Sequence, residues 1–330
     1  MDSVRGYPLL VVIDPDARST DGEAVRIAKD VLCAGAGAKI CLPEGPEEFA
    51  RMLARRGQRR PVVIGDDRAL LRVVGLLHKE RELAGVPLSM VPVGPPAAVA
   101  LSRTLGIPTD TVAAARAVLD GGERPMDLLT DDSDGIVLGS LRIPGGSEAA
   151  GAGRGVSVPQ QSSAVAAADP ADALAARGGP VGPVNGHHPW WKPYARTART
   201  ALSLLGAPAA GRWAAPRSGD GGRPGARRTR VPGQRLRIEA DGVLLADLDR
   251  PVRGVSVVPG GRPGTGSGGE LAEVIVHWPG GARPVRTRAR AVTVSGADFH
   301  YRADALVGGP VRTRTWTVQP GAWRLQLPRG

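Results

Sequence analysis

The sequence predicts an α/β domain followed by an antiparallel β domain, and two observations carry this prediction. The first part of the chain alternates short apolar runs with helical patterns, which is typical of a mostly parallel sheet with helices on both sides. From Arg235 onward, short runs of alternating apolar and polar residues are separated by Gly/Pro loops, as in a β-sandwich or folded sheet. The stretch between them is rich in Ala, Gly, Pro and Ser without a period, which favours a linker. We therefore expect an α/β domain at 1–142, a low-complexity insertion at 143–230 with a helix near 194–205, and a β-sandwich domain at 231–330, whose last strand is free to return to the first domain.

Four apolar runs predict the strands of the first domain. Continuous β-branched runs are typical of strands covered on both faces. The runs lie at Leu9–Ile13, Ala38–Leu42, Pro61–Ile64 and Pro87–Val93.

Start and stop signals predict the helices between these strands. Thr20 and Glu23 form a capping box for a helix that runs to about Ala34. Pro46, followed by two glutamates, opens the next helix with acids beside the positive end of its dipole. Further helices are predicted at Arg68–His78, Ala97–Leu105 and Thr109–Leu119, the last ended by Gly121 and Gly122.

In the second domain, Asp241-Gly242 between two apolar runs predicts a hairpin with a type I′ turn. Further strands are predicted in "VRGVSVV", "ELAEVIVHW", "RTRARAVTVSG" and "VRTRTWTV".

The net charge of +11 permits an anionic partner, such as nucleotide phosphates or an acidic membrane surface, although charge spread over linkers explains it equally well. No nucleic acid is expected, because the basic residues do not alternate with base-stacking aromatics. The two cysteines, Cys33 and Cys41, lack companions at metal-ligand spacing and are expected to be free thiols. No apolar stretch approaches the ~20 residues of a membrane-spanning helix. We expect a cytoplasmic protein, either free or peripheral to the membrane.

Three loops follow carboxyl ends of predicted strands, where ligands bind in open α/β sheets. They lie at Asp14–Arg18, Gly65–Ala69 and Gly94–Ala97. Such corners occur in every doubly wound domain, so that their order and surroundings carry more information than their existence.

This order resembles the diacylglycerol kinase catalytic domain, a family of lipid and sphingoid-base kinases. "VVIGDDRALLRVVGLL" falls where the family has a G-G-D-G-T loop and a helix, and "VVIDPDAR" stands at its N-P-x-x-G strand end. "VPLSMVPVGPPAAVALSRTLGIPTDTVAAARAVLDGGERPMDLL" is similar to the family's next strand, P-L-G-T-G-N-type loop, L-G-I-P segment and "DL" strand. "VTVSGADFHYRADALVGGP" and "WTVQPGAWRLQLP" resemble the closing D-G-E turn and P-G-A-L-x-L-x-x-P finish. The resemblance covers about the first 140 and the last 100 residues.

The resemblance implies an α/β domain of the NAD kinase/diacylglycerol kinase type, a C-terminal β-sandwich, and ATP in a cleft between them. It implies a magnesium-assisted transfer of the γ-phosphate to a lipid hydroxyl at the inner membrane face, and it is compatible with a homodimer. Asp67 and Asp304 match catalytic residues, with Asp304 as the base for the lipid hydroxyl. Glu273 lies near an acidic residue that assists the metal. The expected nucleotide-binding residues are Asp14, Arg18, Gly65, Asp66, Asp67, Arg68, Ala69 and Gly94.

Substitutions in the loops leave two functional hypotheses open. Asp66 and Arg68 stand where the family has glycines, and Pro95 and Pro96 remove two N–H donors. A carboxylate at Asp66 also repels phosphate. The chain is therefore either an ATP-dependent lipid kinase, its activity weakened by these loops, or a catalytically inactive relative that acts as a binding or regulatory module.

Each candidate residue also has a structural alternative. Asp67 suits a helix cap, Asp304 a turn, and Glu273 an exposed strand. Two side-chain clusters also have two interpretations each. For His187, His188, Trp190 and Trp191, a linker pinned to the core is favoured over a membrane contact. For Arg286, Arg288 and Arg290, a solvated strand face is the default, and a patch facing acidic lipid is the alternative.

Overall fold

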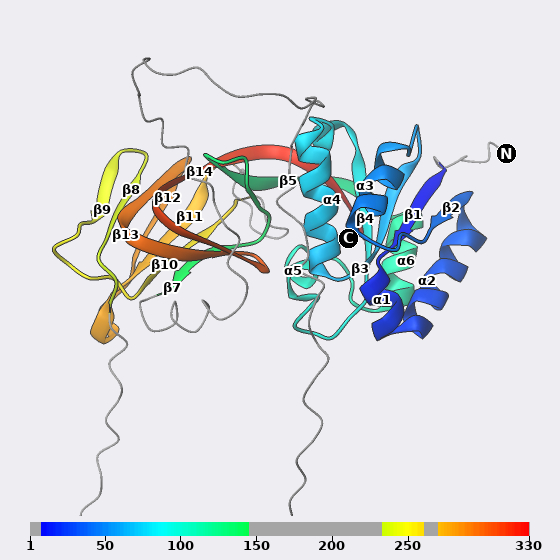
Figure 1. Ribbon diagram of the computed structural model, residues 1–330, viewed down its shortest axis with the longest axis horizontal. Coiled ribbons are helices and arrows are strands. Elements are labelled where there is room, and N and C mark those ends of the chain that lie inside the picture. Colours follow the sequence, from blue (N-terminus) through cyan, green and yellow to red (C-terminus); the bar gives the residue numbers. More distant parts are fainter. Residues whose placement is uncertain (1–7, 145–232, 261–269, 330) are drawn as a thin grey trace, which may run out of the picture. The chain divides into compact units, whose positions relative to one another are not determined.

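The computed structural model describes residues 8–144, 233–260 and 270–329, all of which belong to one compact unit (Figure 1). The predicted linker helix near 194–205 and the His/Trp cluster lie outside the described residues. The architecture is a mixed sheet with helices on its parallel part. In the part of the chain that the structure describes, no helix is long and apolar enough to cross a membrane.

The N-terminal part contains a parallel sheet with the strand order β2-β1-β3-β4. Alternate residues of β1 pack on one face with α2 and α6, while α3 and α4 contact each other on the opposite face. Every residue of β1 is buried for this reason, as its unbroken apolar run predicts. The strands are β1 (Leu9–Ile13), β2 (Ala38–Cys41), β3 (Arg60–Gly65) and β4 (Pro87–Pro92).

The helices agree with the sequence prediction except at the first loop and at α5, which begins at Ala100 instead of near Ala97 because residues 96–99 form turns. The first loop is itself a short helix, and Asp21, rather than Thr20, caps the next one by accepting from the Ala24 N–H at 2.9 Å. The capping box was therefore placed one residue too early, because Thr20 ends the preceding helix. The helices are α1 (Pro15–Thr20), α2 (Gly22–Gly35), α3 (Pro46–Ala54), α4 (Asp67–Lys79), η1 (Leu83–Gly85), α5 (Ala100–Thr104) and α6 (Thr111–Asp120).

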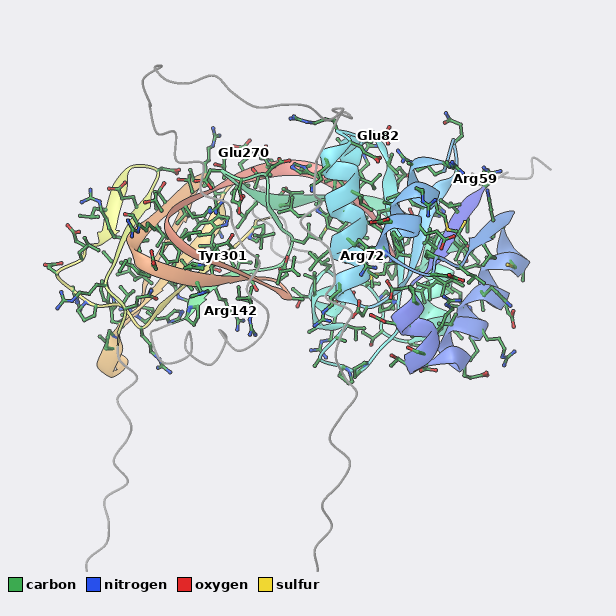
Figure 2. The ribbon with its side chains drawn as sticks, in the orientation of Figure 1. Arg59, Arg72, Glu82, Arg142, Glu270 and Tyr301 are labelled. Atoms are coloured by element: carbon green, nitrogen blue, oxygen red, sulfur yellow. The ribbon has the colours of Figure 1, made fainter. Side chains whose placement is uncertain are left out.

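The remaining strands surround a second apolar core, formed by alternate residues of the antiparallel strands. Tyr301, labelled in Figure 2, packs against this core. Its ring meets that of Trp316 edge-on, with ring centroids 5.2 Å apart. The elements are β5 (Gly122–Asp131), β6 (Ile136–Val137), β7 (Leu141–Pro144), β8 (Leu236–Ala240), β9 (Val243–Ala246), β10 (Gly254–Val258), β11 (Ala272–His277), η2 (Pro279–Gly281), β12 (Val285–Ala289), β13 (Ala291–Ala303) and β14 (Leu306–Leu327).

Two local predictions in this part have clear outcomes. The β8–β9 hairpin has positive φ at both turn residues, 48° at Asp241 and 80° at Gly242, as a type I′ turn requires. The run "RTRARAVTVSG" was predicted as one strand, but it divides into β12 and β13 at Arg290. The Asp241 carboxylate accepts from the N–H groups of Arg290 and Ala291 and holds this corner.

The long strand β14 joins the antiparallel strands to the parallel sheet. It pairs with β13 and β5, and its end runs parallel to β4 with Arg324 opposite Pro87. At its bulge, the Gly321 N–H donates to the Asp127 carboxylate at 2.8 Å. Two motifs that are almost 200 residues apart, the "DL" strand and the "PGA" finish, are therefore in direct contact.

Candidate functional site

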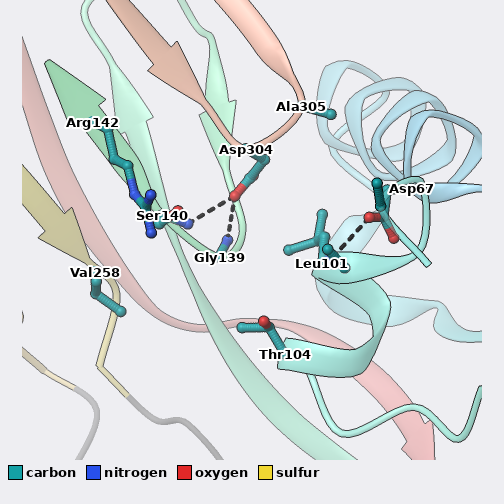
Figure 3. A pocket seen from close by; sticks show the side chains of 11 residues that line it. Asp67, Leu101, Thr104, Gly139, Ser140, Arg142, Val258, Asp304 and Ala305 are labelled. Atoms are coloured by element: carbon teal, nitrogen blue, oxygen red, sulfur yellow. Dashed lines mark hydrogen bonds between the residues drawn. The ribbon is translucent and has the colours of Figure 1, made fainter. Parts of the chain in front are cut away.

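A pocket of about 300 Å³ brings together the two predicted catalytic residues (Figure 3). Asp67 lines it beside Leu101 of α5, while Asp304 lines it from the turn between β13 and β14. Arg142 of β7 and Val258 of β10 complete the strand side. Residues far apart in the sequence thus share one hollow, as the resemblance implies.

Asp67, the first residue of α4, is held by the helix that follows the next strand. Its carboxylate accepts from the N–H groups of Leu101 (2.7 Å) and Ser102 (2.9 Å) and from the Ser102 hydroxyl (2.7 Å). These donors lie at the start of α5, whose backbone N–H groups have no partner within the helix. With an exposed fraction of 4%, Asp67 is a buried cap of α5. Three of the roughly four acceptor positions of a carboxylate are in use.

Asp304 is fixed in a comparable way by the loop between β6 and β7. Its carboxylate accepts from the N–H groups of Leu138 (2.7 Å), Gly139 (2.8 Å) and Ser140 (2.7 Å). Burial raises the pKa of the Asp304 carboxyl group, the three hydrogen bonds act against this rise, and the charge of Asp67 adds to it. Oδ1 accepts two of the bonds and Oδ2 one, so that the free acceptor position belongs to Oδ2.

Asp66 occupies the helix end that a phosphate would need. Its Oδ1 accepts from the N–H groups of Arg68 and Ala69, both at 3.0 Å, and thereby caps α4. Burial raises the pKa of the Asp66 carboxyl group, and the nearby Asp14 charge contributes. A phosphate at this site would have to displace a carboxylate from these donors.

The end of β1 is closed by an ion pair. Asp14, with an exposed fraction of 3%, binds Arg72 of α4 at 2.6 Å and accepts from the Asp16 N–H at 2.9 Å. Gly65 packs against this group, since an added Cβ would lie 3.0 Å from the Asp14 Cβ and 2.8 Å from that of Ala69. Gly65 is not among the residues with positive φ. Space, rather than a positive φ, therefore requires glycine at this position.

The loop after β4 offers few N–H donors. Gly94 has a φ of 146°, which favours glycine, but the next two residues are prolines. The N–H of Ala98 is bonded to the Pro95 carbonyl, and the Ala98 carbonyl accepts from the Asp67 N–H at 2.9 Å. This loop is thus tied to α4 by its own backbone.

The other predicted site residues do not line the pocket. Arg18 donates to the Pro43 carbonyl at 3.2 Å. Glu273, on β11, forms an exposed ion pair with Arg286 at 3.1 Å, which matches its structural alternative. Arg68 is exposed.

Sequence reasoning missed the Leu138–Ser140 loop and Arg142. Gly139 is the residue that allows the loop to approach, because an added Cβ would lie 2.5 Å from Leu101 Cδ1 and 3.1 Å from Asp304 Oδ1. The only signal in the sequence is a Gly-Ser pair between two short apolar runs.

The residues present do not fit the triphosphate that the resemblance implies. The N–H groups at the start of α4 are bonded to Asp66, those of α5 to Asp67, and two further donors are replaced by prolines. Within residues 8–144, 233–260 and 270–329, no group of three or more Asp, Glu, His or Cys side chains is placed to hold a metal ion.

Comparison with known proteins supports the fold. No protein-family model matches the chain, and no curated protein matches its sequence. Three solved structures of a diacylglycerol kinase from Bacillus anthracis str. Sterne, an assignment marked as provisional for two of them, match it at 11% identity. Their TM-scores are 0.58 and 0.59, over 99% of this chain and 98% of theirs. The described residues therefore share the fold of these structures, and the predicted resemblance is confirmed at the level of the fold.

Proposed function

We propose that this chain is a lipid-binding relative of the diacylglycerol kinases that does not transfer phosphate. The observation that carries the proposal is the occupation of both helix starts by the chain's own carboxylates. Asp66 takes two N–H groups of α4, and Asp67 takes the first N–H groups of α5. The start of a helix binds phosphate through free N–H groups and through the positive end of the helix dipole. A carboxylate at the same place accepts hydrogen bonds from those N–H groups and puts its negative charge beside the dipole, so that it replaces the phosphate in both interactions.

Phosphate transfer is the decisive experiment. The full chain is incubated with MgATP and diacylglycerol in mixed micelles, and phosphorylated lipid is measured. We expect no product above background and no magnesium-dependent rise of Tm with ATP, because a ligand that binds the folded state must stabilise it. Product that disappears in Asp304→Asn and persists in Asp298→Asn, an exposed residue of β13, the strand that leads to Asp304, would overturn the proposal.

The second candidate is the ATP-dependent lipid kinase itself. It is favoured by the presence of Asp67 and Asp304 in one pocket and by the free acceptor position on Asp304 Oδ2. A carboxylate with a raised pKa is suited to accept a proton from a hydroxyl. ATP and Mg²⁺ are the cofactors that this candidate requires. A lipid at the inner membrane face, a peripheral cytoplasmic location and a homodimer stay predictions under both candidates.

A further inference from the structure

Two arginines lie opposite each other on the outer face of the antiparallel strands. Arg142 of β7 and Arg302 of β13 are direct partners in the antiparallel register. Both are exposed, whereas Leu141 and Ile143 beside Arg142 are in the core, so that the guanidinium groups are on the side away from that core. Side chains in such a position have Cβ atoms about 4.5–5.5 Å apart, and like charges there are destabilising.

No carboxylate of the described residues neutralises this pair. Glu273, on the same face, is bound to Arg286 at 3.1 Å. The Asp304 carboxylate is engaged by three backbone N–H groups. Across the ranges that the structure describes, neither Arg142 nor Arg302 forms an ion pair or a side-chain hydrogen bond. The repulsion is thus left without compensation inside this part of the chain.

One arginine of the pair, Arg142, lines the pocket of the candidate site, and Arg302 is its partner on the neighbouring strand. Arg142 lines the strand side, and Figure 3 shows it across the pocket from Leu101 and Thr104. The other wall is largely apolar, with alanines of the α5 region beside Leu101. A volume of about 300 Å³ is at the lower end of small-molecule sites. It suits a headgroup rather than a pair of acyl chains.

We propose that Arg142 and Arg302 bind the phosphate of a phosphomonoester whose uncharged part enters this pocket. Two guanidinium groups match the charge of a phosphomonoester, which approaches two negative charges, and each planar fork matches two phosphate oxygens. Asp67 and Asp304 each already accept three hydrogen bonds from the chain itself, so that neither requires a cationic group of the ligand as a donor. This inference rests on the proposed function, since it names the ligand class of the same pocket.

A purely structural role does not account for the pair. An exposed cross-strand arginine pair lowers the stability of the free protein, and glutamine at either position would remove that repulsion without leaving a carboxylate unpaired. A bound anion between the two guanidinium groups would attract both and thereby compensate their mutual repulsion. We therefore expect Arg302→Gln to raise the Tm of the free protein while it weakens ligand binding.

The experiment measures binding of the full chain to phosphatidylcholine vesicles that contain phosphatidic acid, with phosphatidylglycerol vesicles of equal surface charge for comparison. Arg142→Gln and Arg302→Gln are compared with Arg286→Gln, which lies on the same face but has its own carboxylate partner. We expect Arg142→Gln and Arg302→Gln each to weaken binding about tenfold, the loss of one charge-assisted contact. Arg286→Gln is expected to change it less than about twofold, as a rim charge does.

A soluble arm identifies the source of the phosphate. Inorganic phosphate and glycerol 3-phosphate are added in a thermal-shift measurement with the same variants. A rise of Tm that requires Arg142 assigns the site to a soluble ester, whereas binding seen with vesicles alone assigns it to a lipid headgroup. Either result supports the site. It is overturned if neither arm shows binding, or if Arg286→Gln weakens binding as much as the other two variants. Phosphate transfer from MgATP would refute the proposed function without affecting these binding results.

Discussion

The substitution Asp67→Ala separates a structural from a catalytic role for the first predicted catalytic residue. It removes three hydrogen bonds that join α4 to α5, at 2.7, 2.9 and 2.7 Å. Each contributes about 1 kcal/mol net, and a donor left buried without a partner costs roughly 1–3 kcal/mol. We therefore expect a loss of about 3–5 kcal/mol in the free energy of unfolding, which is a large fraction of the stability of a typical domain.

Urea denaturation followed by tryptophan fluorescence measures this loss, since Trp316 and Trp323 are buried. The matched control is Asp66→Ala at the neighbouring position, which removes an ordinary helix cap and is expected to cost about 1 kcal/mol. Asp67→Asn keeps an acceptor for Ser102 but turns a donor toward the Leu101 N–H, with an expected cost of about 1–3 kcal/mol. A catalytic role alone predicts a stable Asp67→Asn variant without activity. If the free energy of unfolding of Asp67→Ala differs from that of the unchanged chain by less than about 1 kcal/mol, the argument that Asp67 caps α5 is refuted.

Three further substitutions test other parts of the site. Gly65→Ala would place a Cβ 2.8 Å from that of Ala69; this overpacking is expected to cost about 1–3 kcal/mol, and an unchanged urea midpoint would contradict it. Arg302→Gln removes the like charge opposite Arg142 and is expected to stabilise the free protein by about 0.2–1 kcal/mol. This gain should shrink as salt screens the two charges. Thermal denaturation at two ionic strengths measures it. Burial raises the pKa of the Asp127 carboxyl group, whose Oδ2 lacks a partner among the described residues. The fold therefore loses stability as the pH rises from the unfolded-state pKa to the higher folded-state pKa of Asp127, and this loss is complete above the folded-state pKa. Asp127→Asn is therefore expected to stabilise the fold at neutral pH and to have no effect once acid has protonated Asp127. A Tm difference independent of pH would contradict this.

Hydrophobic patterning determined the elements of the fold. The run at Leu9–Ile13 predicts β1 with its bounds, because a strand buried on both faces must be apolar throughout. Asp241-Gly242 predicts its turn, because only a few residues accept positive φ twice in succession. The error at Thr20 has a local cause, since two possible caps stand side by side and the hydrogen bond of Asp21 decides between them.

The site depended on contacts that sequence spacing does not contain. The sequence placed Asp66 and Asp67 in one loop, but only the tertiary structure shows that Asp66 caps α4 and Asp67 caps α5. The same holds for Asp304, whose three N–H donors come from a loop more than 160 residues earlier. Propensity and periodicity act between neighbours along the chain, and they determine helices and strands. Which donors a carboxylate meets depends on how those elements pack, and that was decided by the fold alone.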